Sequence, residues 1–322
     1  MQGRETMKTQ SVYNGIDVSK KTLHLGSPEK FLGEFANTPK GHQQLLRKLK
    51  TNKPTLILLE ASGGYERNIV EFLQDQGLAV HVAQPGCVRH FAKSIKVLAK
   101  TDRIDASVIA RFGQATKPNP TPQTPQNLRN LRALNDRREQ VVEDRVREAN
   151  RLELATHPAV VKQIQESIDR LENLEQELDQ QIQTLCSQDV QLHQKSQAMM
   201  KLKGVGPKTA NVLLAHLPEL GKVSRQQIAS LAGLAPHPRE SGTWKGKRKI
   251  YGGRSAVRKA LFLAARVASR WCPVIKKFYQ RLKENGKAYK LAIIACARKM
   301  LAKLNSQIRQ LENLGECQTI KT

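Results

Sequence analysis

Four carboxylates lie at positions where they could hold a hard cation. Asp17 lies in a strand-like run, Glu60 ends a second run that is almost wholly apolar, and Asp102 and Asp105 are three residues apart. A spacing of three places both side chains on one face of a helix. Carboxylate oxygens are the ligands that Mg²⁺ prefers, and such ions can assist attack on a phosphodiester. The four residues therefore predict a site for one or two Mg²⁺ ions.

The overall charge makes these carboxylates unexpected. The 322 residues include 54 Lys and Arg against 28 Asp and Glu, a net charge of +26. This balance predicts a polyanionic partner, most commonly nucleic acid. Aromatic residues make up only 4% of the chain, which favours contacts to phosphates and grooves over base stacking. Taken singly, each carboxylate also fits a simpler explanation, because Thr101 or Asp102 could cap a helix and strand ends are commonly polar.

A glycine-containing turn is a second candidate for phosphate contact. Residues 202–210 read Leu-Lys-Gly-Val-Gly-Pro-Lys-Thr-Ala, with expected helices on both sides, as in helix-hairpin-helix modules. Backbone N–H groups at such a turn can approach a phosphate, and Lys203 and Lys208 add charge beside it. A tight helix–helix turn that binds nothing is the alternative.

The densest positive charge lies further along the chain. Residues 239–299 contain 18 Lys and Arg against two acids, a net charge of +16. This segment should therefore contact nucleic acid most strongly. Six of its basic side chains are candidates for phosphate contact: Lys245, Lys247, Arg248, Lys249, Arg254 and Arg258.

Two serines in this basic segment could act as nucleophiles. Ser241 precedes Gly242, and Ser255 follows a Gly-Gly pair and one arginine. A serine hydroxyl needs a base or a metal ion to activate it, and nearby Arg and Lys would stabilise charge on a transferring phosphoryl group. From these residues alone, either serine or neither could be catalytic. The turn before Ser255 leads into an expected helix, which favours a capping role for Ser255.

The elements that must position these residues divide the chain into four regions. Residues 1–116 alternate strand-like and helix-like segments, which predicts an α/β layer. Residues 117–125 contain four prolines and predict a linker. Residues 126–195 are polar with apolar residues at heptad spacing, which predicts a long helical hairpin or a coiled coil. Residues 196–322 are expected to form a compact, mainly helical domain.

Short elements are expected within the α/β region. A turn near Lys20 and Lys21 should join the first two strands. Leu56–Glu60 is apolar except for its last residue, which predicts a central strand buried on both faces. The expected strands lie within 11–26, at 35–38, at 56–60 and at 78–82, and the expected helices lie at 39–49 and between Gly64 and Gly77.

The motifs occur in the order in which a known family has them. From end to end, the chain resembles the DEDD transposases and Piv-type invertases of insertion-sequence family one-ten. The matching stretches are Gly-Ile-Asp-Val-Ser-Lys at 15–20, Glu-Ala-Ser-Gly-Gly-Tyr at 60–65, Lys-Thr-Asp-Arg-Ile-Asp-Ala at 100–106, Gly-Val-Gly-Pro-Lys-Thr-Ala at 204–210, Ala-Gly-Leu-Ala-Pro at 232–236, Glu-Ser-Gly at 240–242 and Gly-Gly-Arg-Ser-Ala-Val-Arg-Lys-Ala-Leu-Phe at 252–262.

The resemblance implies both a fold and a mechanism. It implies an N-terminal RuvC-like, RNase H-type domain and a C-terminal transposase domain that contains the helix-hairpin-helix-like turn. Asp17, Glu60, Asp102 and Asp105 would be the acidic tetrad that binds Mg²⁺. Ser241 would be the nucleophilic serine that attacks a DNA phosphate. The implied activity is that of the DNA recombinase of an insertion sequence.

The resemblance also implies partners. These are a structured guide RNA and the donor and target double-stranded DNA with which it pairs. A dimer or tetramer is also expected, in which the helical region bridges subunits so that Ser241 and the tetrad meet at one phosphate. Five cysteines without a C-x-x-C pair, and the lack of an apolar run of about 18 residues, favour a cytoplasmic bacterial protein without a membrane segment. Two other functions stay open. One is a Holliday-junction-type endonuclease in which the tetrad activates water, and the other is a nucleic-acid-binding protein without catalysis.

Overall fold

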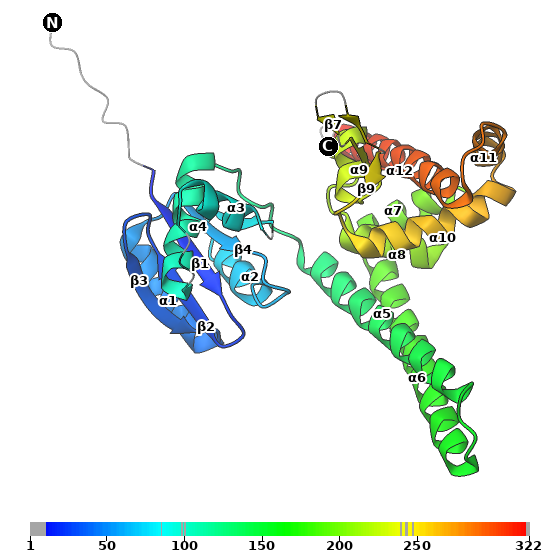
Figure 1. Ribbon diagram of the computed structural model, residues 1–322, viewed down its shortest axis with the longest axis horizontal. Coiled ribbons are helices and arrows are strands. Elements are labelled where there is room, and N and C mark those ends of the chain that lie inside the picture. Colours follow the sequence, from blue (N-terminus) through cyan, green and yellow to red (C-terminus); the bar gives the residue numbers. More distant parts are fainter. Residues whose placement is uncertain are drawn as a thin grey trace, which may run out of the picture. The chain divides into compact units, whose positions relative to one another are not determined.

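The chain forms two compact units, one ending at Gln123 and one beginning at Thr124. The computed structural model describes residues 11–319 apart from 85, 98, 100, 239, 242, 243 and 247, and the side chains of 240, 241, 244, 245 and 314–319 are outside its description. The first unit is coloured blue to cyan in Figure 1, and the second runs from green to red.

A five-stranded mixed sheet is the centre of the first unit. Its strand order is β3-β2-β1-β4-β5, in which β2 is antiparallel to β1 and β3, whereas β4 is parallel to β1 and β5. The predicted α/β layer is therefore confirmed. The strands are β1 (Tyr13–Val18), β2 (Thr22–Gly26), β3 (Phe31–Ala36), β4 (Leu56–Glu60) and β5 (Val80–Ala83), and the helices are α1 (Pro39–Asn52), α2 (Arg67–Asp75), α3 (Cys87–Ser94) and α4 (Asp102–Thr116).

Helices cover both faces of this sheet. On one face, Ile16, Ile57 and Leu59 pack with buried leucines and valines of α1 and α2. On the other face, Tyr13 and Leu58 pack with α3 and α4. Alternate residues of a strand point to opposite faces, so Asp17, two residues from Gly15 and four from Tyr13, belongs to the face that α4 covers. Strand β4 has neighbours on both sides and is buried from Leu56 to Leu59, as its apolar sequence predicts.

The predicted bounds of two strands are wrong. Strand β3 begins at Phe31 rather than at residue 35, and it ends at Ala36 rather than at residue 38, because the Thr38 hydroxyl accepts the N–H of Gly41 at 3.3 Å and caps α1. Strand β5 begins at Val80 rather than at Leu78. The N–H of Leu78 donates to the carbonyl of Leu73 at 3.1 Å and so belongs to the closing turn of α2.

The second unit is mainly helical, as expected. Its core gathers fully buried side chains such as Leu261, Met300 and Leu304 from several helices. Two short antiparallel pairs, β6–β9 and β7–β8, lie between α9 and α10. The elements are α5 (Gln126–Leu152), α6 (Pro158–Gln188), α7 (Val190–Met200), α8 (Pro207–His216), α9 (Arg225–Leu231), β6 (Pro236–His237), β7 (Glu240–Ser241), β8 (Trp244–Lys245), β9 (Lys249–Ile250), α10 (Ser255–Trp271), α11 (Pro273–Glu284) and α12 (Tyr289–Thr319).

The heptad residues of the sequence lie in a hairpin within one chain. Helices α5 and α6 run side by side in Figure 1 and pack against each other. Ile168, Leu178 and Ile182 of α6 are buried in this single chain. Their burial needs no second copy, so assembly into a dimer or tetramer stays a prediction. Among the residues that the structure describes, no helix combines the length and hydrophobicity needed to cross a bilayer.

Candidate active site

Helix α4 begins with two of the four predicted acids. Thr101 has an extended backbone, and its hydroxyl accepts the N–H of Ile104 at 3.3 Å, so Thr101 is the N-cap. Asp102 and Asp105 occupy the first turn, where the helix dipole also favours carboxylates. Because Thr101 caps the helix, the carboxylate of Asp102 is not needed for that purpose, and its side chain is 63% exposed.

Small residues let α4 lie almost directly on the strands. A Cβ atom added to Gly15 of β1 would lie 2.2 Å from the carbonyl oxygen of Ala106, and one added to Gly26 of β2 would lie 2.8 Å from the carbonyl carbon of the same residue. A Cβ atom on Gly113 of α4 would lie 2.3 Å from a methyl group of Leu58. Ala106 directly follows Asp105, so this close approach holds the acidic first turn against β1 and β2.

The sheet register forms a row of polar side chains on the same face. Asp17 pairs with His24 of β2, and His24 pairs with Glu34 of β3. Glu60 follows Leu59, the partner of Ile16, so it lies beside Asp17 where the two parallel strands end. Side chains opposite one another in a sheet point to one face. Glu34, His24, Asp17 and Glu60 therefore form a row across four strands.

The structure brings two of the four predicted acids together: ligand atoms of Asp17, Asp102 and His24 all lie within 4.8 Å of one another. Asp105 and Glu60 are outside that group, but both lie near enough for their charges to act on Asp17. Burial and the charges of Asp102 and Asp105 raise the pKa of Asp17 to about 6; His24 opposes this rise, and Glu60 adds to it. One oxygen of Glu60 accepts the backbone N–H of Gly86 at 2.8 Å, which fixes its carboxylate at the end of β4.

These residues fit a divalent cation. Carboxylates that crowd one another are stabilised by a cation, and no hydrogen-bond donor in the described part of the chain occupies the lone pair of the buried Nδ1 of His24. Oxygen and imidazole donors are both common ligands of divalent metals. The four acids are those that the sequence singled out, whereas His24 was not among the predicted site residues.

The crowding of charge also gives a prediction about stability. The pKa of Asp17 rises from 3.8 to about 6 on folding, so the metal-free protein should lose stability as the pH rises from about 4 to above 6. Above that range, Asp17→Asn should raise the free energy of unfolding in EDTA by about 1–3 kcal/mol. Urea unfolding measures the change. Glu29→Gln, an exposed control in the same unit, should be neutral, and a destabilised Asp17→Asn variant would contradict the crowding.

The predicted nucleophile lies in the second unit, on the short pair β7–β8. The backbone of Ser241 pairs with that of Trp244. The side chains of Ser241 and Lys245, and the whole of Lys247, lie outside the described residues. Arg248 and Lys249, which follow, are exposed.

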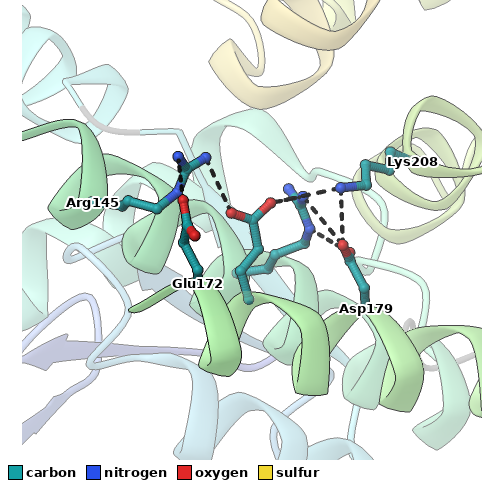
Figure 2. A network of polar contacts seen from close by, with 6 residues as sticks. Arg145, Glu172, Asp179 and Lys208 are labelled. Carbon is teal, nitrogen blue, oxygen red and sulfur yellow. Dashed lines mark hydrogen bonds and ion pairs between the residues drawn. The ribbon is translucent and has the colours of Figure 1, made fainter. Parts of the chain in front are cut away.

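Lys208 of the glycine turn belongs to an ion-pair network (Figure 2). Its Nζ lies 2.9 Å from Asp179 and 3.6 Å from Glu175, both of α6. Arg138 of α5 binds the same two acids, and Arg145 extends the network along the hairpin. Burial alone would raise the pKa of Asp179, but hydrogen bonds from Arg138 and Lys208 outweigh burial and lower it. Lys208 thus ties α8 to the hairpin, which competes with phosphate binding.

The two glycines of this turn differ. Gly204 has φ +101°, and a Cβ there would lie 2.8 Å from the carbonyl oxygen of Ala264, so it is required for packing against α10. A Cβ at Gly206 would meet nothing within 4 Å, and Lys203 is exposed. Within the described part of the second unit, the Gly206 side of the turn is open to a phosphate, whereas the Gly204 side is packed against α10.

Basic residues at the start of α10 also have internal partners. Arg254 donates to both oxygens of Glu219, at 2.5 and 2.6 Å, and Arg258 donates to the carbonyl of Gly252 at 2.7 Å. The expected capping by Ser255 is wrong, because the N-cap is Arg254 and it makes no side-chain capping bond. The turn before α10 is held instead by these arginine contacts.

Comparison with known proteins identifies the class. A family model named for the DEDD transposases of IS110 elements and described as a transposase matches residues 14–158. A second, described as the transposase of the IS116/IS110/IS902 family, matches residues 196–280. The chain therefore belongs to the IS110 family of transposases.

Its relatives include proteins named for the rearrangement of DNA. The pilin gene-inverting proteins of Moraxella bovis and Moraxella lacunata are each 29% identical, over 314 and 310 residues, covering 92% of this chain and 96% of each relative. An uncharacterized 43.6 kDa protein of insertion element IS110 from Streptomyces coelicolor is 29% identical over 152 residues, covering 47% of this chain and 36% of that protein.

Proposed function

We propose that this transposase is a metal-dependent DNA recombinase that uses Ser241 as its nucleophile. The observation that carries the proposal is that ligand oxygens of Asp17 and Asp102 lie within 4.8 Å of each other in a protein with net charge +26, with Glu60 and Asp105 near enough for their charges to act on Asp17. Repelling carboxylates are an unexpected feature of a chain with so many cations, unless they serve a bound metal ion. The mixed sheet beneath them supports the RuvC-like, RNase H-type assignment that the family resemblance implies.

Four carboxylates would hold one or two divalent cations, which we propose to be Mg²⁺ in keeping with the oxygen ligands. When bound, such an ion supplies positive charge that favours an attacking or leaving oxygen at phosphorus. The carboxylates of the protein would hold the ion in place and neutralise part of its charge. Glu60 is fixed by Gly86, and Asp102 and Asp105 are fixed by the packing of α4.

The covalent step exchanges one phosphoester for another. The Oγ of Ser241 bonds to phosphorus as the bond from phosphorus to the leaving DNA strand breaks. The leaving strand keeps the oxygen and ends as a hydroxyl group after it gains a proton, and Ser241 loses one. A hydroxyl of a DNA strand later attacks the phosphoserine, which restores Ser241 and joins the strands. No net hydrolysis occurs, and basic residues near Ser241 stabilise charge on the phosphoryl group.

The partners follow from the family resemblance. We propose that a structured guide RNA pairs with donor and target DNA, and that the active species is a dimer or tetramer. The exposed Arg248 and Lys249 and the open side of Gly206 would contact phosphates. Lys208 and Arg254 bind acids within the second unit, and these ion pairs would compete with phosphate binding.

A denaturing gel tests the chemistry. Cleaved DNA that carries covalently attached protein is expected from the serine mechanism. Cleavage by a metal-activated water would give free ends instead. Complete cleavage without any attached protein would reject Ser241 as nucleophile and favour the Holliday-junction-type endonuclease.

The basic segment gives a prediction about salt dependence. Changing Lys247, Arg248 and Lys249 together to Gln should reduce the slope of log affinity against log salt by about 2 to 3, because each lost phosphate contact removes about 0.9. Fluorescence anisotropy with labelled DNA measures the slope. The control changes Lys40, Lys48 and Lys50, which are exposed in the first unit, and alters net charge equally. Equal slopes for both variants would contradict the prediction, because they would mean that the salt dependence follows net charge and not the basic segment.

A further inference from the structure

His24 is a buried histidine between two carboxylates. It is 6% exposed, in the middle of β2, and its register partners are Asp17 on one side and Glu34 on the other. The proposed function assigns no role to His24 or Glu34.

The two ring nitrogens of His24 have different surroundings. Nε2 lies 3.5 Å from Oε2 of Glu34. Nδ1 is buried and, among the residues that the structure describes, has no hydrogen-bond partner. Its distance to Oδ2 of Asp102 is 4.0 Å, too long for a hydrogen bond, although both atoms belong to the group that lies within 4.8 Å together with Asp17.

This arrangement favours one tautomer. A proton on Nε2 can be donated toward Glu34, which leaves the lone pair of Nδ1 facing the carboxylates. Histidines that bind metals commonly donate the other ring N–H to a carboxylate, which fixes the ring and raises its basicity. Without a metal ion or a hydrogen-bond donor, a buried lone pair on Nδ1 is energetically unfavourable. The row Glu34–His24–Asp17 therefore has the chemistry of a carboxylate–histidine–metal arrangement.

We propose that Nδ1 of His24 is a ligand of the metal held by Asp17 and Asp102, and that Glu34 positions it. The inference rests on the metal-binding part of the proposed function and adds a specificity to it. Mg²⁺ prefers oxygen ligands, whereas imidazole is a good ligand for Co²⁺. Among first-row divalent metals, Co²⁺ also binds a given site more tightly than Mn²⁺ does. His24 thus makes the site favour transition-metal ions more than four carboxylates alone would.

Binding of Co²⁺ and of Mg²⁺ to the full-length, metal-free protein tests this directly. Co²⁺ is followed by its visible absorption and by calorimetry, and Mg²⁺ by its competition with Co²⁺. His24→Ala should weaken Co²⁺ binding at least about 100-fold and Mg²⁺ binding much less, and it should change the Co²⁺ spectrum. Glu34→Gln should weaken Co²⁺ binding about tenfold, within the range for partners of a ligand. His90→Ala and Glu29→Gln, both exposed in the same unit, should match wild type.

The outcomes separate this inference from the proposed function. Equal losses for both metals, or none, in His24→Ala would overturn the role of His24 as a ligand. If His24→Ala fails to fold by circular dichroism, Glu34→Gln decides, because Glu34 is half exposed and its loss should leave the fold intact. Asp102→Asn should weaken both metals. If it weakens neither, the metal site of the proposed function fails, whatever His24 does.

Discussion

Asp102→Asn should reduce DNA strand cleavage by at least about 100-fold, the loss that even a partner of a metal ligand can cause. Asn keeps the shape of the side chain and removes its charge, so the change acts on the metal site and not on the core. Thr101 caps α4, and the side chain of Asp102 is 63% exposed, so the helix should form as before. Cleavage of end-labelled DNA in Mg²⁺ measures the loss.

Binding to nucleic acid separates this effect from a general loss of function. Affinity should stay near the wild-type value in a mobility-shift assay, because phosphate contacts come from basic side chains elsewhere. Glu29→Gln removes one exposed carboxylate of the same unit and should cleave normally. Wild-type cleavage by Asp102→Asn would refute the acidic tetrad.

Pattern and spacing were enough to predict the sheet and to single out acids that the sheet register then places near one another. Asp17 lies near the end of a strand-like run, Glu60 ends an apolar one, and neighbouring parallel strands end at the same edge of a sheet. The sequence even contained a signal for His24 that was not used. A hairpin turning at Lys20 and Lys21 pairs residue 17 with residue 24, which is the observed register.

Contacts made in three dimensions were beyond the sequence. Nothing in residues 14–18 indicates that a helix more than eighty residues later will lie on Gly15. The structure shows it, because a Cβ at Gly15 would lie 2.2 Å from the carbonyl oxygen of Ala106. In the sequence, Lys208 looks like a phosphate ligand because it is a basic residue at the start of a helix. Nothing near it in the sequence indicates that an acid of another helix will bind it. Asp179, its partner, becomes a neighbour through the packing of α6 against α8.

Ser241→Ala should abolish both the covalent protein–DNA species and recombination. No other group can replace the lost hydroxyl in forming the phosphoserine. Affinity for DNA and RNA should persist, since one hydroxyl contributes little to a large charged interface. The adduct is measured on denaturing gels with labelled DNA, and binding is measured on the same preparations. Ser241→Cys could retain a trace of adduct, because a thiolate is also a nucleophile.

Ser255→Ala is the matched control for Ser241→Ala. Ser255 is an exposed serine in the same basic segment, and the structure gives its side chain no capping bond to lose. The change should therefore leave stability, adduct and recombination near wild type, whereas a capping serine would cost about 1 kcal/mol on replacement. If Ser255→Ala removes the adduct and Ser241→Ala does not, the two roles are exchanged. If both variants form the adduct, a different residue attacks the DNA, and the serine assignment fails even though the metal site stands.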